Sequence, residues 1–118
     1  MYFDSKGLPT DVGASDYMDS ARLAGIMAVF GHPQMTKEKI LLYMINESQA
    51  VRYPFSDPYN PASNNPNNFT RDQLVCLAAG LKVLGCDEAC KQLLKAARER
   101  NYRAQNIESD IVGSEDFS

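Results

Sequence analysis

The sequence predicts an all-α fold of two antiparallel helical hairpins joined by a long, ordered crossover loop. Three observations support this expectation. Apolar residues recur at helical spacing in the segments on both sides of the crossover. Residue types that start and stop helices bound these segments. Between them, the stretch AVRYPFSDPYNPASNNPNNFT contains four prolines and five asparagines, which excludes a helix or a central strand.

The size and charge of the chain indicate one small globular domain. Its 118 residues, 44% of them apolar, can bury a core of ordinary composition. The net charge of −3 argues against direct nucleic-acid binding, because such surfaces usually carry a basic excess. No apolar run approaches the length of a membrane span, and the N-terminal residues show no secretory leader. We therefore expect a cytoplasmic protein without a membrane interaction.

The chain contains three cysteines and one histidine, which bear on redox, metal and nucleophile chemistry. An odd cysteine count outside a secretory context predicts reduced thiols. The histidine, His32, is far in sequence from Cys86 and Cys90, so a four-ligand zinc site is not expected. Cys76 falls on an apolar helix face and is read as a core thiol. We expect no metal and no cofactor.

The expected organisation has five segments. They are an irregular arm (1–14), a first hairpin (15–49), the crossover (50–69), a second hairpin (70–101) and a tail (102–118).

The first hairpin is predicted from its caps and its short connection. The first helix should begin near residues 15–16 and stop at Gly31, because glycine readily adopts the left-handed conformation that ends helices. Gly25, inside this helix, costs about 1 kcal/mol relative to alanine, and the expected return is close approach by another helix. The second helix should follow Thr36 as N-cap and fade around residues 47–49.

The second hairpin has the clearest start signal. Thr70 and Gln73 fit a capping box, and Phe69 and Leu74 occupy the two positions of a hydrophobic staple. Gly85 should end this third helix. A fourth helix should begin near Asp87. Its inner stripe is predicted to be Cys90, Leu93, Leu94 and Ala97.

The crossover is the predicted partner-binding surface. Tyrosine and arginine are enriched at interface hot spots, and a rigid proline-rich loop lowers the ordering cost of binding. The residues expected to carry it are Arg52, Tyr53, Phe55, Asp57, Tyr59, Asn60 and Arg71. The structural alternative is that the two arginines pair with nearby aspartates.

Carboxylates are the better enzymatic candidates, although no complete catalytic set is visible. Asp72 falls in the first turn of the third helix, and Asp57 falls inside the aromatic, asparagine-rich crossover. Paired carboxylates across a groove carry out glycoside hydrolysis. The structural alternative is that the helix dipole favours Asp72 and that Asp57 opens a turn.

Two blocks of sequence carry a resemblance. SDYMDSARLAGIMAVFGHP (15–33) and RYPFSDPYNPASNNPNNFTRDQLVCLAAGL (52–81) resemble proteins encoded by tailed phages and prophages. The segment NFTRDQL also resembles a hairpin of (α/α) barrel glycan-active proteins, which would imply an acid role for Asp72. In size and charge the chain is similar to phage-encoded inhibitors of bacterial defence, such as anti-CRISPR proteins.

These observations lead to a primary hypothesis and two alternatives. The primary hypothesis is a phage- or prophage-encoded, non-enzymatic protein that binds another protein in the host cytoplasm and inhibits a defence system. The first alternative is a glycan-binding or glycan-hydrolysing remnant of an (α/α) barrel protein. The second is a virion component that assembles with copies of itself, so a homo-oligomer is left open.

Overall fold

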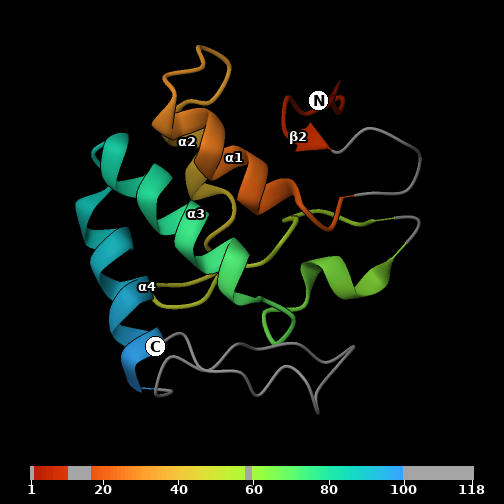
Figure 1. Cartoon of the computed structure of the whole chain (residues 1–118). Coiled ribbons are helices and arrows are strands. Elements are labelled where there is room, and N and C mark those ends of the chain that lie inside the picture. The colour runs from red at the N-terminus through yellow and green to blue at the C-terminus, as the bar shows by residue number, and fades with distance from the viewer. Residues whose placement is uncertain (1, 11–16, 58–59, 100–118) are drawn as a thin grey trace.

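A computed structural model describes residues 2–10, 17–57 and 60–99. In these residues the protein is mostly helical, as predicted, with one small N-terminal sheet (Figure 1). The elements in chain order are β1 (Tyr2–Phe3), β2 (Pro9–Thr10), α1 (Ser20–Val29), α2 (Lys37–Leu41), the 3-10 helix η1 (Pro61–Asn64), α3 (Arg71–Val83) and α4 (Asp87–Glu99).

The N-terminal segment forms a β-hairpin, so the prediction of an irregular arm is wrong for the described part. β1 and β2 pair antiparallel. Asp4 Oδ1 accepts hydrogen bonds from the backbone N–H groups of Lys6 and Leu8, each at 2.9 Å. Gly7 adopts a φ of +78°, which closes the turn. Because each strand has only two residues, the alternation that signals a strand is absent. The part of the prediction covering 11–14 lies outside the described residues.

Helix α1 begins later than expected and stops where expected. Residues 17–19 lie in a turn ahead of Ser20, whereas the predicted start at 15–16 lies outside the described residues. Asp19 occupies the N-cap position, but its side chain makes no capping hydrogen bond. Gly31 has a φ of +74°, which confirms the predicted stop.

Helix α2 has the predicted cap but ends early. The Thr36 hydroxyl accepts a hydrogen bond from the Lys39 N–H at 3.3 Å. The helix ends at Leu41, although the sequence favoured continuation to residues 47–49. From Leu42 to Met44 the backbone N–H groups bond to carbonyls three residues back instead of four, and Asn46 Oδ1 then accepts hydrogen bonds from the backbone N–H groups of Ser48 and Gln49, which folds the segment into a turn.

Helix α3 begins at Arg71, but the predicted capping box is wrong. The side chain of Thr70 makes no capping hydrogen bond, and Gln73 is directed elsewhere. The two staple residues, Phe69 and Leu74, are both buried in the main core cluster. Gly85, with a φ of +81°, ends the helix as predicted.

Helix α4 begins at Asp87, as predicted. Cys90, Leu93 and Ala97 are buried, but Leu94 is exposed, so its assignment to the inner stripe is wrong. The polar helix residues leave only a narrow buried face, and Leu94 lies just outside it.

The two separate hairpins are not confirmed, because the principal helix pair is α1 with α3. These helices lie side by side (Figure 1), and they cross at two glycines. A Cβ atom at Gly25 would lie 1.9 Å from the Cys76 carbonyl oxygen, and one at Gly80 would lie 2.8 Å from the Gly25 Cα. The close helix approach expected at Gly25 is therefore confirmed, and its neighbour is α3.

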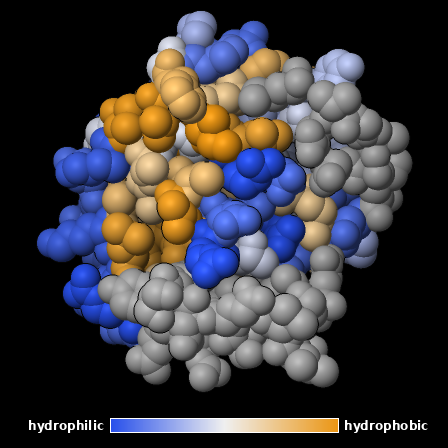
Figure 2. Space-filling view, viewed as in Figure 1, coloured by the Kyte–Doolittle hydropathy of each residue, from blue (hydrophilic) through white to orange (hydrophobic). Residues whose placement is uncertain are grey.

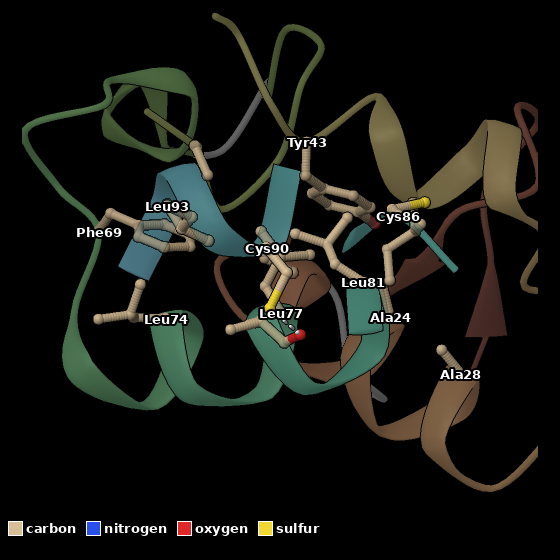
Figure 3. Close-up of a cluster of buried hydrophobic side chains, with 14 of the residues drawn as sticks. Ala24, Ala28, Tyr43, Phe69, Leu74, Leu77, Leu81, Cys86, Cys90 and Leu93 are labelled. Carbon is tan, nitrogen blue, oxygen red and sulfur yellow. Dashed lines mark hydrogen bonds between the residues drawn. The ribbon is translucent and has the colours of Figure 1, made fainter. Parts of the chain in front are cut away.

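The core lies where α1, α3 and α4 meet the loop segments (Figure 3). Its largest fully buried apolar side chains include Leu8, Ile40, Tyr43, Leu77, Leu81 and Leu93. The Tyr43 hydroxyl lies 2.5 Å from the Ser20 hydroxyl, which satisfies both groups inside this core. The core thus holds α1 and α3 side by side, with α4 packed on α3.

Candidate protein-binding surface

The crossover turns two of its predicted binding residues inward. Arg52 is buried, and its Nε donates a hydrogen bond to the Asn68 carbonyl oxygen at 2.8 Å. Tyr53 is buried as well, and its hydroxyl donates to the carboxylate of Asp4. Burial and this hydrogen bond raise the pKa of Tyr53 above its ordinary value, so the phenol stays a neutral donor. Both side chains tie the crossover to the rest of the fold.

Asp57 has the same internal role. It is buried, and its carboxylate accepts hydrogen bonds from the Ser63 hydroxyl at 2.6 Å and from the Asn60 N–H at 3.1 Å. The Asn60 side chain in turn caps η1 by accepting from the Ala62 N–H at 3.1 Å. The asparagine-rich composition of the crossover is therefore used in turns and caps.

The other predicted binding residues lie in different settings. Phe55 is half-buried, with its ring centroid 5.9 Å from that of Tyr53 and 4.8 Å from the Lys6 ammonium. Arg71 is exposed in the first turn of α3. Tyr59 lies outside the described residues. The structure thus brings Tyr53 and Phe55 together but does not present the set as one solvent-facing surface.

The two carboxylates considered for catalysis do not share a setting. Asp57 is buried against its own loop, whereas Asp72 is exposed in the first turn of α3. A glycosidase needs both carboxyl groups to face one cleft that holds the sugar. Neither residue lines the hollows described below.

The three thiols lie in settings that disfavour the nucleophilic thiolate. Burial raises the pKa of Cys76, Cys86 and Cys90 above the usual value for a thiol. Cys90 Sγ also donates a hydrogen bond to the Ala78 carbonyl oxygen at 3.3 Å. His32 is exposed in the turn after α1. Within the described ranges, no three His, Cys, Asp or Glu side chains are grouped to hold a metal ion.

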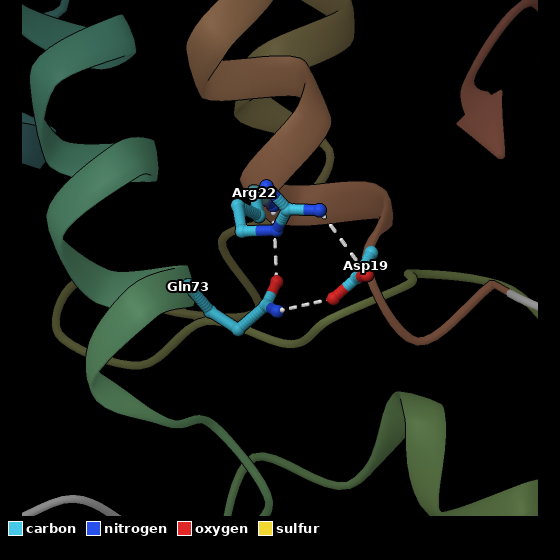
Figure 4. Close-up of polar contacts among 3 residues, drawn as sticks. All are labelled: Asp19, Arg22 and Gln73. Atoms are coloured by element: carbon cyan, nitrogen blue, oxygen red, sulfur yellow. Dashed lines mark hydrogen bonds and ion pairs between the residues drawn. The ribbon is translucent and has the colours of Figure 1, made fainter. Parts of the chain in front are cut away.

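A polar cluster of Asp19, Arg22 and Gln73 joins the starts of α1 and α3 (Figure 4). Gln73 Oε1 accepts a hydrogen bond from the backbone N–H of Arg22 at 3.0 Å, and Gln73 Nε2 donates one to Asp19 Oδ1 at 3.2 Å. The second Asp19 oxygen pairs with the Arg22 guanidinium at 3.2 Å. This cluster explains why neither Asp19 nor Gln73 caps its own helix. It sets the position of α3 beside α1.

A broad exposed apolar feature spans α1, α3 and α4, and we name it the α1/α3/α4 apolar surface. It is lined by Ile26, Val29, Phe30, Val75, Cys76, Ala78, Ala79, Cys90 and Leu94, of which Ala78 and Cys90 are themselves buried. Phe30 is 84% exposed, Val75 57% and Leu94 41%. Figure 2 shows apolar side chains gathered over α1, α3 and the adjoining part of α4.

Two adjoining hollows shape this surface. One, of about 660 Å³, lies between α3 and α4, and a smaller one of about 140 Å³ lies between α1 and α3. Val75 and Ala79, on the exposed face of α3, line both hollows, so the two adjoin across this helix, and we refer to them together as the apolar depression. The charged rim of the larger hollow consists of Lys82, Asp87 and Lys91, in which Lys82 and Asp87 form an ion pair at 3.4 Å.

The sequence contained a signal for this surface. Helix α1 and its C-cap carry apolar residues on every side, including Ile26, Val29 and Phe30, which is more than one buried face requires. The sequence pattern does not predict which helix crosses α1. It therefore could not show which of these extra apolar residues face solvent and which face the core.

A further hollow, of about 490 Å³, lies between the segment after α2 and α4. Its lining includes Leu41, Met44 and Ala89 as apolar residues and Glu47 and Glu88 as acidic ones. It lacks a strongly exposed aromatic side chain like Phe30. The α1/α3/α4 apolar surface is therefore the better candidate for binding.

No protein-family model, curated protein or solved structure matches the chain. In residues 2–10, 17–57 and 60–99, no helix has both the length and the apolar character that crossing a bilayer requires. Function is therefore inferred from the surface and its chemistry.

Proposed function

We propose that this chain is a non-enzymatic protein that acts by binding another protein through the α1/α3/α4 apolar surface. One observation carries the proposal: Phe30, Val75 and Leu94 are exposed around two adjoining apolar hollows, one on each side of α3. Soluble proteins rarely expose contiguous apolar patches of this kind unless the patch binds something. Aromatic side chains in such patches are frequent hot spots of binding energy.

The close packing of the supporting helices favours binding. The glycine crossing at Gly25 and Gly80 holds α1 against α3 without intervening side chains. The polar cluster of Asp19, Arg22 and Gln73 holds the same two helices together at their N-terminal ends. A surface that is already ordered loses little conformational entropy when a partner binds.

The proposal extends to a biological setting. Residues 15–33 and 52–81 resemble proteins of tailed phages and prophages, and the chain is small and acidic. These features support a role in the cytoplasm of a bacterial host, where the chain would bind and inhibit a defence complex in the manner of anti-CRISPR proteins. The apolar surface would then be the part that contacts the host protein.

The test combines partner capture with matched variants. The full chain is used as bait in host lysate, the captured protein is identified and purified, and its affinity is measured by calorimetry. Phe30→Ser should weaken binding about tenfold or more, since truncating a hot spot costs about 2 kcal/mol or more and tenfold corresponds to about 1.4 kcal/mol. Ile45→Ser is the matched control, because Ile45 is also exposed but lies outside the surface.

The functional readout is interference with phage or plasmid DNA in cells that carry the defence system. Wild-type chain and Ile45→Ser should relieve interference, and Phe30→Ser should not. Equal affinity of all three proteins for the partner would refute the proposed surface. Unchanged interference with the wild-type chain would refute the defence setting.

A further inference from the structure

Helix α4 presents a stripe of exposed residues beside the apolar depression. Asp87, Lys91, Leu94 and Arg98 follow one another at intervals of four, three and four residues, so they share one helix face. The first three also line the hollow between α3 and α4. The stripe is therefore acidic at its N-terminal end and basic at its C-terminal end, with Leu94 between.

This order of charges is self-complementary when the helix is reversed. In an antiparallel pair of α4 helices, a two-fold axis halfway along the stripe places Asp87 opposite Arg98 of the second copy. Lys91 then lies opposite Leu94 of the second copy, which its aliphatic stem can cover. Both contacts occur twice, as a two-fold interface requires. A parallel pair would instead set like charges against each other.

The distances along the helix suit the hollow. Asp87 and Arg98 are separated by about 16 Å along the helix axis, at roughly 1.5 Å per residue. The two ion pairs would thus flank the apolar depression, with Val75 and Leu94 enclosed between them. Asp87 can accept both from Lys82 of its own chain and from the facing arginine, because a carboxylate has several acceptor sites.

We propose that a second copy of this chain occupies the α1/α3/α4 apolar surface, with the two α4 helices antiparallel and Asp87 paired with Arg98 across the two-fold axis. The inference rests on the proposed function, which makes this a binding surface, and the second copy and the host protein would compete for it. A second copy is favoured because the acidic end of the α4 stripe matches the basic end of the same stripe on an antiparallel copy.

Sedimentation velocity of the full chain over a range of concentrations tests this directly. The wild-type chain should shift from monomer to dimer as concentration rises. Asp87→Lys and Arg98→Glu should each weaken the dimer about tenfold or more, because each places like charges opposite one another twice.

An equimolar mixture of the two variants should restore dimerisation. In the mixed dimer, the lysine introduced in one chain faces the glutamate introduced in the other. On the other side of the axis, Asp87 and Arg98 keep their native pairing, each supplied by the chain in which it is unchanged. Both ends of the stripe then again bring opposite charges together.

Lys37→Glu and Glu38→Lys on α2 are matched controls, because they reverse charges outside the surface. They should leave dimerisation unchanged, and their mixture should behave like either variant alone. Circular dichroism melting checks that every variant is folded.

A wild-type chain that stays monomeric at every concentration would overturn the inference, as would a dimer that the α4 variants do not weaken or that mixing does not restore. Failure here is distinguishable from failure of the proposed function. If the chain is monomeric but Phe30→Ser loses affinity for a purified host protein, the binding surface stands and only the second copy is excluded.

Discussion

At the residue scale, single side chains determine how closely the helices approach. Gly25 lies where the backbone of α3 leaves no room for a Cβ atom. The Gln73 side chain bonds to α1 instead of forming a capping box at the start of α3, and so joins the two helices. Both residues act through tertiary contacts. Local sequence patterns do not predict these roles, because they would favour alanine in place of Gly25 and a capping interaction for Gln73.

Gly25→Ala should therefore destabilise the protein. The added methyl group would meet the Cys76 carbonyl oxygen, and overpacking of this kind costs about 1–3 kcal/mol, more than the roughly 1 kcal/mol gained in helix propensity. Urea unfolding followed by circular dichroism measures the change. Gly31→Ala is the comparison. A Cβ atom there would meet open space, so any loss of stability reports only the cost of placing alanine at a φ of +74°. A Gly25→Ala protein as stable as wild type would show that the helices can separate at little cost.

The buried phenols predict a loss of stability at alkaline pH. Burial raises the pKa of Tyr43 and Tyr53 in the folded protein, whereas both ionise near pH 10 when unfolded. The stability that these two phenols contribute is complete at pH values below their pKa in the unfolded chain. It is lost as the pH rises toward their higher pKa in the folded protein, because only the unfolded chain then releases these protons. The free energy of unfolding should fall above about pH 10.

Tyr53→Phe should reduce this alkaline slope by up to about 1.4 kcal/mol per pH unit, which is the contribution of one proton. Urea unfolding at several pH values between about 8 and 11, which bracket the ordinary tyrosine pKa, gives the slope for each protein. Tyr2→Phe, at an exposed position, is the control for removing a phenol hydroxyl. An identical slope in all three proteins would contradict the role of the buried phenol.

At the element scale, the sequence predicted helix ends better than helix partners. Thr36, Gly31 and Gly85 act through groups within a few residues, so their patterns can be read locally. The crossing of α1 with α3 depends on contacts between distant segments, and no local pattern encodes them. The candidate binding surface was missed for the same reason: it exists only once α1, α3 and α4 are assembled.

The threonines at the N-cap positions of α2 and α3 provide a matched test at this scale. Thr36→Ala should lower the free energy of unfolding by about 1 kcal/mol, because its hydroxyl accepts a helix N–H. Thr70→Ala should cost clearly less, because the Thr70 side chain makes no capping hydrogen bond. Chemical denaturation of both variants gives the comparison. Equal losses would mean that Thr70 caps α3 in solution.

At the scale of the whole molecule, the structure separates two surfaces that the sequence did not distinguish. The crossover uses Arg52, Tyr53 and Asp57 to hold its own conformation, whereas the helices leave an apolar depression facing solvent. Composition pointed to the crossover, because tyrosine and arginine are common in interfaces. The same side chains also satisfy buried polar groups, and here they do so.

The central claim is that the helical surface, not the crossover, binds the partner. The most direct measurement is the change in backbone amide shifts, by heteronuclear NMR, when purified partner or a rising concentration of the chain itself is added. Perturbations should centre on Phe30, Val75, Ala79 and Leu94. Perturbations confined to residues 50–69, with these four unchanged, would contradict the account.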